Sequence, residues 1–211
     1  MTQEPGLRER KKEQTRRKIW SAAIDLFSER GYDQVSVAEV AAAADVSKMT
    51  VFNYVSTKED LVLGPMEEHV GDPAAVVRDR PAGESAVAAM RRQFIAALDA
   101  HDASVGLNAD PYVLRVRRLV DETPSLVLRV RDFSARSAAL LAAELESDTG
   151  DPLLAQVAAV QLIGVRSVLI GENHRLLLAG ETPDQVHPGA VERAGRAFAL
   201  AENGLRGYAV R

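Results

Sequence analysis

Residues 36–55 read SVAEVAAAADVSKMTVFNYV, and their pattern predicts two short helices joined by a tight turn. Ser36 and Glu39 form the S-x-x-E pattern, in which each side chain caps a free backbone N–H at the start of a helix. Asp45 tolerates the left-handed conformation that a tight turn requires. Ser47 is then placed to cap the second helix.

The second helix is predicted over residues 48–55, with Val51, Phe52 and Val55 on its buried side. The remaining side chains point outward: Lys48, Met49, Thr50, Asn53 and Tyr54. A cation, an amide, two hydroxyls and a thioether suit hydrogen bonding to base edges and phosphates, and contact with thymine methyl groups. The alternative interpretation is an ordinary solvated helix face.

The flanking sequence carries a family resemblance. A helix over residues 11–30 ends at Gly31, and another begins near Thr57 with acidic residues in its first turn. In order and spacing, about residues 15–61 resemble the N-terminal domain of the tetracycline-repressor (TetR) family of one-component transcription regulators. The particular signs are AAIDLFSERGYDQVSVAEVAAAADVS, followed by KMTVFNYVSTKEDLV.

The resemblance implies an all-α fold: an N-terminal three-helix DNA-binding domain with a helix-turn-helix, over residues 1–60, and a C-terminal helical ligand-binding and dimerisation domain, over residues 61–211. It implies that the helix beginning at Ser47 enters the major groove. Lys48, Met49 and Thr50 would then lie at base edges, Asn53 and Tyr54 at bases or phosphates, and Ser36 and Lys58 at the DNA backbone. Three positions depart from the family pattern: Asp45 replaces the common Gly, Phe52 the usual Tyr, and Val55 the usual aromatic residue.

Charge is unevenly distributed along the chain. The net charge is -4, but residues 1–60 hold ten basic and ten acidic residues, so the remainder carries the whole excess. Residues 7–18 contain seven basic and two acidic side chains, a local balance of +5. Such a run favours contact with phosphates or a minor groove, although a solvated terminus is the alternative.

Beyond residue 83 the pattern is helical, with helices expected over residues 84–101 and 110–121, from Pro124, from Asp151 to about Leu178, and from Pro188 to about Tyr208. Residues 153–171 are apolar nearly all round, which predicts a helix buried on most sides. The resemblance implies that the last two helices pair with those of a second subunit. A symmetric homodimer of this kind would bind a double-stranded palindromic operator.

The resemblance also implies that the middle helices enclose a pocket for a small-molecule effector of unknown identity. The candidate pocket residues are Met90, Phe94, Leu98, Tyr112, Arg118, Phe133, Arg166, His174 and Leu177. Core packing is the alternative for the apolar members. Arg166 lies in an apolar helix and needs an anionic partner, which is either a carboxylate across the dimer or an acidic ligand.

Several function classes are disfavoured. The chain has no cysteine, which excludes disulfides, thiolate catalysis and cysteine-ligated zinc. The four histidines have no metal-ligand spacing, and no phosphate-binding loop or nucleophile elbow is present, so we expect neither catalysis, nor a metal, nor a cofactor. No secretory signal and no clean run of eighteen apolar residues is apparent, so we expect a cytoplasmic protein. The sequence favours a ligand-released repressor. A helix-turn-helix protein acting through non-specific DNA or protein contacts, without ligand control, is the alternative.

Overall fold

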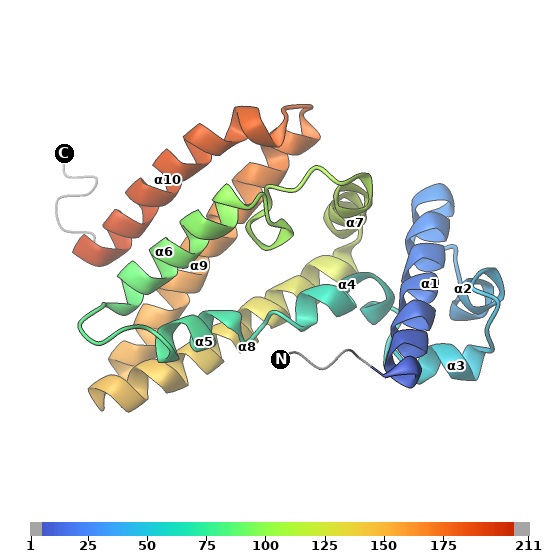
Figure 1. Ribbon diagram of the computed structural model, residues 1–211, viewed down its shortest axis with the longest axis horizontal. Helices are drawn as coiled ribbons and strands as arrows, with labels where there is room; N and C mark the ends of the chain where they lie inside the picture. Colours follow the sequence, from blue (N-terminus) through green and yellow to red (C-terminus); the bar gives the residue numbers. More distant parts are fainter. Residues whose placement is uncertain (1–5, 205–211) are drawn as a thin grey trace. The chain divides into compact units, whose positions relative to one another are not determined.

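The computed structural model describes residues 6–204, within a chain that divides into two compact units. The first unit comprises Met1–Pro65 and Arg115–Arg129, and the second comprises Met66–Leu114 and Val130–Arg211. Every regular element in residues 6–204 is helical, which confirms the all-α prediction (Figure 1). The α-helices are α1 (Leu7–Arg30), α2 (Val37–Ala43), α3 (Lys48–Phe52), α4 (Asp60–Glu67), α5 (Asp72–Arg78), α6 (Ala86–Asp99), α7 (Pro111–Glu122), α8 (Pro124–Thr149), α9 (Pro152–Leu178) and α10 (Pro183–Asn203).

Helix boundaries differ from the expected ones at several places; α1, for example, begins at Leu7 rather than at residue 11. Helix α10 begins at Pro183, because Thr182 and Gln185 form a capping box there, and it continues through Pro188. The expected start at Pro188 is therefore wrong, and the expected end near Tyr208 lies outside the described residues. The helix predicted over residues 48–55 is shorter: α3 ends at Phe52, with Asn53 as its C-cap.

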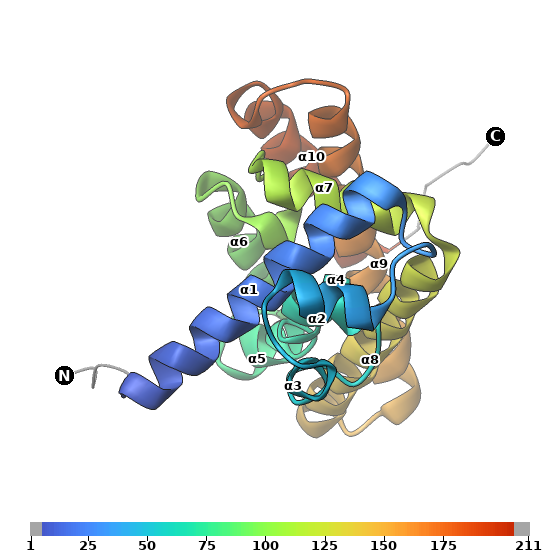
Figure 2. The ribbon, with the colours of Figure 1, turned by 90° about the vertical axis from the view of Figure 1, so that its right-hand side faces the viewer.

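The first unit packs α2 and α3 on one side of α1 (Figures 1 and 2). Ile19, Ala23 and Phe27 of α1 are almost completely buried, together with Val40 of α2 and Val51 of α3. Burying a large apolar side chain stabilises a fold by about 1.5–3 kcal/mol. This small core therefore holds the short helices α2 and α3, which are too short to be stable alone.

Polar contacts join residues 115–129 to the rest of the first unit. Arg115 of α7 lies 2.8 Å from the Asp25 carboxylate of α1. Arg129 of α8 lies 3.5 Å from the carboxylate of Asp60, which begins α4. These residues fall outside the range 1–60 that the sequence assigns to the DNA-binding domain.

In the second unit, α10 packs against both α6 and α9 (Figure 1). Phe94 and Phe198 form the centre of this core, with ring centroids 5.9 Å apart. Gly106 lies in the turn after α6 with a φ of 72°, and a Cβ there would be 2.6 Å from the carbonyl oxygen of Ile170 in α9. This turn therefore approaches α9 as closely as it does because it carries no side chain.

Helix α9 has one buried face and one exposed apolar face. Ala159 and Leu162 are buried, whereas Leu153, Val160 and Val168 are 68%, 57% and 72% exposed. The prediction that this helix is buried on most sides is therefore wrong for the single chain, because its neighbours cover only one face. By length and composition α9 is also the one helix in residues 6–204 that could cross a membrane, an exception to the expected lack of such a segment.

Candidate nucleic-acid interface

The turn between α2 and α3 has the geometry that its sequence predicts. Ser36 and Glu39 make both bonds of a capping box at the start of α2. Asp45 adopts a φ of 55°, so it takes the left-handed conformation for which glycine is more usual. The Ser47 hydroxyl accepts from the Thr50 backbone N–H and shares a 2.8 Å hydrogen bond with the Thr50 hydroxyl, which fixes the start of α3.

The exposed face of α3 combines cationic, amide and apolar side chains. Lys48, Met49 and Asn53 are exposed, with Met49 at 71%, whereas Thr50 and Tyr54 are half-buried. Val51 and Val55 are buried, as predicted.

The prediction that Phe52 is buried is wrong, because its side chain is 43% exposed. The Lys48 ammonium lies 5.8 Å from the centroid of the Phe52 ring, one helical turn away. Phe52 therefore belongs to the face of α3 that also carries Met49. Its position in the TetR pattern, where the family has a phosphate-directed Tyr, was the signal for an outward orientation.

Ser36 and Lys58 are engaged within the first unit. The Ser36 backbone N–H, the Arg30 guanidinium and the Ser36 hydroxyl all donate to the Glu39 carboxylate, and together they lower the pKa of Glu39 to about 2. The Lys58 ammonium donates to the Tyr32 carbonyl oxygen over 2.6 Å and lies 4.2 Å from the centroid of the Tyr32 ring. Burial raises the pKa of the Tyr32 hydroxyl, so this ring stays neutral beside the ammonium.

The basic run at the start of the chain is helical. Residues 7–18 form the first half of α1, where Lys11, Lys12 and Lys18 are exposed. Glu13 accepts from Arg17 and Arg16, each over 2.9 Å, and both bonds lower the pKa of Glu13. The basic side chains of residues 7–18 therefore project from a regular α-helix.

The residues predicted to bind a ligand lie in different places. Met90, Phe94, Leu98 and Leu177 are buried in the core of the second unit, where they pack against other side chains. Phe133 and His174 are also buried, Tyr112 and Arg166 are half-buried, and Arg118 is exposed in the first unit rather than the second.

A hollow of about 370 Å³ in the second unit is lined by other residues: Asp72, Ala75, Val76, Asp79, Arg92 and Gln93. Of the predicted ligand residues, Arg166 lies next to it, because its guanidinium donates to Gln93. Within residues 6–204, no group of three or more His, Asp or Glu side chains is arranged to hold a metal ion.

Comparison with known proteins agrees with this geometry. Residues 19–64, which span α2, α3, the second half of α1 and most of α4, match a family described as bacterial regulatory proteins of the tetR family. The chain is 32% identical over 152 residues to the HTH-type transcriptional regulator TcmR of Streptomyces glaucescens, an alignment covering 70% of this chain and 67% of TcmR. The chain belongs to the TetR family. A shorter match links this TetR regulator to an HTH-type transcriptional repressor of Mycobacterium tuberculosis, with 37% identity over 34% of this chain and 39% of that protein.

Solved structures share the fold of this TetR regulator. NalD of Pseudomonas aeruginosa, the secondary repressor of the MexAB-OprM multidrug efflux pump, superposes with a TM-score of 0.59 at 18% identity, covering 89% of this chain and 96% of NalD. GusR of Salmonella enterica gives a TM-score of 0.54 at 18% identity, covering 92% of this chain and 96% of GusR. Regulators of the TetR family bind DNA, act as dimers and are generally repressors of transcription.

Proposed function

We propose that this TetR regulator is a homodimeric repressor that reads an approximately palindromic operator through α3 and is released from it by a small-molecule effector. The observation that carries the DNA-reading part is the mixed chemistry of the exposed face of α3. Packaging DNA without regard to sequence requires only cations, whereas this face adds an amide and two apolar side chains to its one lysine.

Each side chain of this face suits a particular contact. Lys48 suits the acceptors of guanine or a phosphate, and Asn53 suits the donor and acceptor pair of adenine. Met49 and Phe52 suit thymine methyl groups, because both expose apolar surface. Ser47, Thr50 and Tyr54 would supply hydroxyls to bases or phosphates, and Ser36 and Lys58 would lie at the DNA backbone near two helix starts.

The dimer would form through α9 and α10. The exposed apolar face of α9, which includes Leu153, Leu154, Val157, Val160 and Val168, is of the kind that soluble proteins cover with a partner. Two copies related by a two-fold axis would place two α3 helices in successive major grooves, which is why we expect a palindromic operator.

Effector control would act through residues 61–211, with residues 1–60 as the DNA-binding domain. A ligand that binds the DNA-incompetent conformation more tightly would shift the population away from operator binding. Helix α4, which carries the chain from the first unit to the second, would change the separation of the two α3 helices. NalD represses a multidrug efflux pump, which is consistent with control by small molecules.

Selection of bound sequences from a random double-stranded DNA library, at roughly physiological salt, tests the DNA-reading part. We expect one palindromic motif. Lys48→Ala should change the selected bases as well as the affinity, and Tyr54→Ala should weaken binding without altering the dimer. A folded dimer that selects no motif would favour the alternative of non-specific DNA or protein contacts.

Sedimentation velocity tests the dimer interface. Val160→Glu places a charge on the exposed face of α9 and should convert the dimer to a monomer with weakened operator binding. Leu128→Glu is the matched control, since Leu128 is 64% exposed on α8 and lies outside the proposed interface. A Val160→Glu protein that stays dimeric would contradict this placement of the interface.

A further inference from the structure

Arg166 is a cation on the inner face of α9, away from the exposed apolar face. It lies one turn from the buried residues Leu162 and Ile163, and its side chain is half-buried. Its guanidinium donates to the amide oxygen of Gln93 over 3.0 Å and lies 5.6 Å from the centroid of the Phe94 ring. This orientation places Arg166 inside the second unit and not on the face proposed for dimerisation.

The charge of Arg166 has no close counter-ion in residues 6–204. Of the five N–H donors of this guanidinium, one meets an acceptor in the described part of the chain, and that acceptor is neutral. Burial lowers the pKa of Arg166, and the attraction of Asp72 opposes this shift only in part. A partly desolvated cation without an ion pair is costly, which makes Arg166 a candidate for binding an anion.

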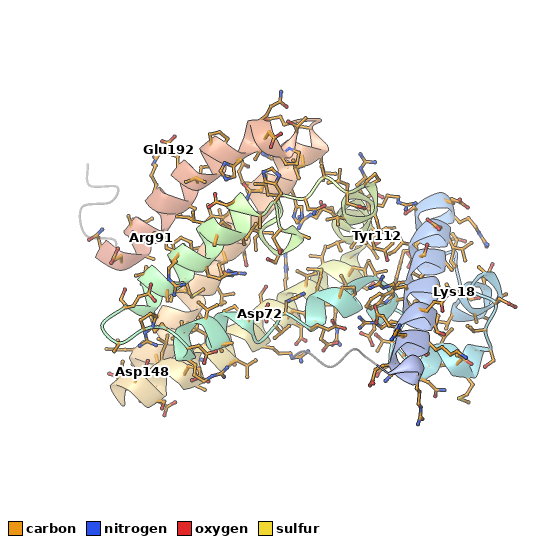
Figure 3. The ribbon with its side chains drawn as sticks, in the orientation of Figure 1. Lys18, Asp72, Arg91, Tyr112, Asp148 and Glu192 are labelled. Atoms are coloured by element: carbon orange, nitrogen blue, oxygen red, sulfur yellow. The ribbon has the colours of Figure 1, made fainter. Side chains whose placement is uncertain are left out.

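The adjacent hollow has room for such an anion. Its volume of about 370 Å³ lies at the lower end of the range for small-molecule pockets. Gln93, which accepts from Arg166, and Asp72, which attracts it, both line the hollow. Figure 3 labels Asp72, which belongs to α5. The guanidinium therefore contacts the wall of the hollow through Gln93, although Arg166 is not itself a lining residue.

The other charged residues of the hollow have polar partners, and for Arg92 and Asp79 these partners carry the opposite charge. Arg92 binds Glu84 over 2.8 Å, Asp79 lies 3.2 Å from Arg78, and Asp72 lies 2.8 Å from the His69 ring. Among the described residues beside the hollow, Arg166 is the cation whose hydrogen-bond acceptor is neutral. An incoming anion would thus be attracted by Arg166 rather than by the residues that line the hollow.

We propose that Arg166 is the anchor for an organic monocarboxylate that binds in this hollow, and that this ligand is the effector. A carboxylate matches the fork of a guanidinium with two parallel hydrogen bonds and would replace the Gln93 amide oxygen as acceptor. Asp72 and Asp79 at the rim disfavour a dianion such as phosphate and favour hydroxyl or amino groups on the body of the ligand. The effector role rests on the ligand control proposed above; the anion site does not.

The first test needs no ligand. Arg166→Met removes the uncompensated charge and keeps much of the side-chain volume, so the melting temperature of the ligand-free protein should rise by about 2–4 °C. Arg91→Met is the matched control on α6 (labelled in Figure 3), because Arg91 lies 3.8 Å from Glu202 and is not among the residues that line the hollow. This control should leave the melting temperature nearly unchanged. A lower melting temperature for Arg166→Met would mean that Arg166 is a structural residue and would overturn the proposal.

The second test uses 4-hydroxybenzoate, with 4-hydroxybenzamide as its uncharged analogue, in calorimetric titrations of the full-length protein. The wild type should bind the carboxylate and not the amide, and Arg166→Gln should weaken binding by about 10- to 100-fold. Equal binding of the two compounds, unchanged affinity in Arg166→Gln, or no binding by the wild type would each overturn the proposal.

Operator affinity, measured in the same samples, separates the two proposals. Carboxylate binding through Arg166 that leaves operator affinity unchanged would retain the anion site and overturn its effector role. A wild type that binds the carboxylate but selects no operator would instead overturn the DNA-reading function while the anion site remains.

Discussion

Asp60 offers a direct test of how the first unit is held together. Its buried carboxylate begins α4, and one of its oxygens accepts from the backbone N–H groups of Ser56 and Thr57, over 3.0 and 2.9 Å. The other oxygen faces Arg129 at 3.5 Å. Replacing Asp60 thus affects both the segment that follows α3 and the attachment of α8 to the first unit.

The magnitudes follow from these contacts. A hydrogen bond to a charged group contributes about 1.5–3 kcal/mol, and water replaces part of it here because Ser56 and Thr57 are exposed. We therefore expect Asp60→Ala to lower the free energy of unfolding of the first unit by about 2–3 kcal/mol. Asp60→Asn keeps an oxygen for the two backbone N–H groups and loses mainly the pair with Arg129, so its cost should be about 1 kcal/mol.

Urea unfolding monitored by tryptophan fluorescence is the assay, because Trp20, the single tryptophan of the chain, lies in the first unit. The Asp60→Ala midpoint should fall by about 1 M. Operator affinity should fall in parallel, since the same carboxylate orders the residues after α3. If Asp60→Ala and Asp60→Asn have equal midpoints, then the hydrogen bonds from the two backbone N–H groups do not supply most of the stability that Asp60 contributes.

Three further predictions follow from local geometry. In thermal unfolding, Gly106→Ala should destabilise the protein by several kcal/mol more than Gly83→Ala. Both glycines have a positive φ, but only a Cβ at Gly106 would clash with backbone, the Ile170 carbonyl oxygen at 2.6 Å. Similar losses of stability in the two variants would contradict this close approach. The pKa of Glu39 is lowered from 4.5 to about 2 by folding, so its contribution to stability is present above pH 4.5 and lost as the pH falls toward 2. In circular dichroism the stability advantage of the wild type over Glu39→Gln should therefore disappear across that range, whereas a constant difference would exclude this linkage. Replacing operator thymines by uracil should weaken DNA binding by the wild type about fourfold per contacted methyl group. The same replacement should weaken DNA binding by Phe52→Ala less. An equal effect on both proteins would exclude Phe52 as a methyl contact.

Local sequence signals predicted the helix-turn-helix well because its determinants lie within a few residues of one another. The capping box of Ser36 and Glu39, the left-handed Asp45 and the Ser47 cap each depend on neighbouring backbone groups. Phe52 shows the limit of this reasoning. Its apolar character suggested burial, but the direction in which a short helix turns its side chains depends on its contacts with α1 and α2.

Contacts between distant segments could not be predicted in the same way. The pair of Asp25 with Arg115 spans 90 positions, and the pair of Asp60 with Arg129 spans 69, so no spacing rule connects them. The same holds for Gln93 and Arg166, which are 73 positions apart. The sequence identified Arg166 as a cation that needs an anion, but it left open on which side of α9 that anion lies.

The amino-acid sequence by itself determined the all-α character, the caps of α2 and α3, the family and most of the side chains on the exposed face of α3, because these depend on short-range backbone and side-chain interactions. Only the tertiary structure decided that Phe52 is exposed, that α9 is covered on one face alone, and that Arg166 donates to Gln93, a residue that lines a hollow. Burial and pairing are properties of the neighbours that a side chain meets in space, and those neighbours come from helices far apart along the chain.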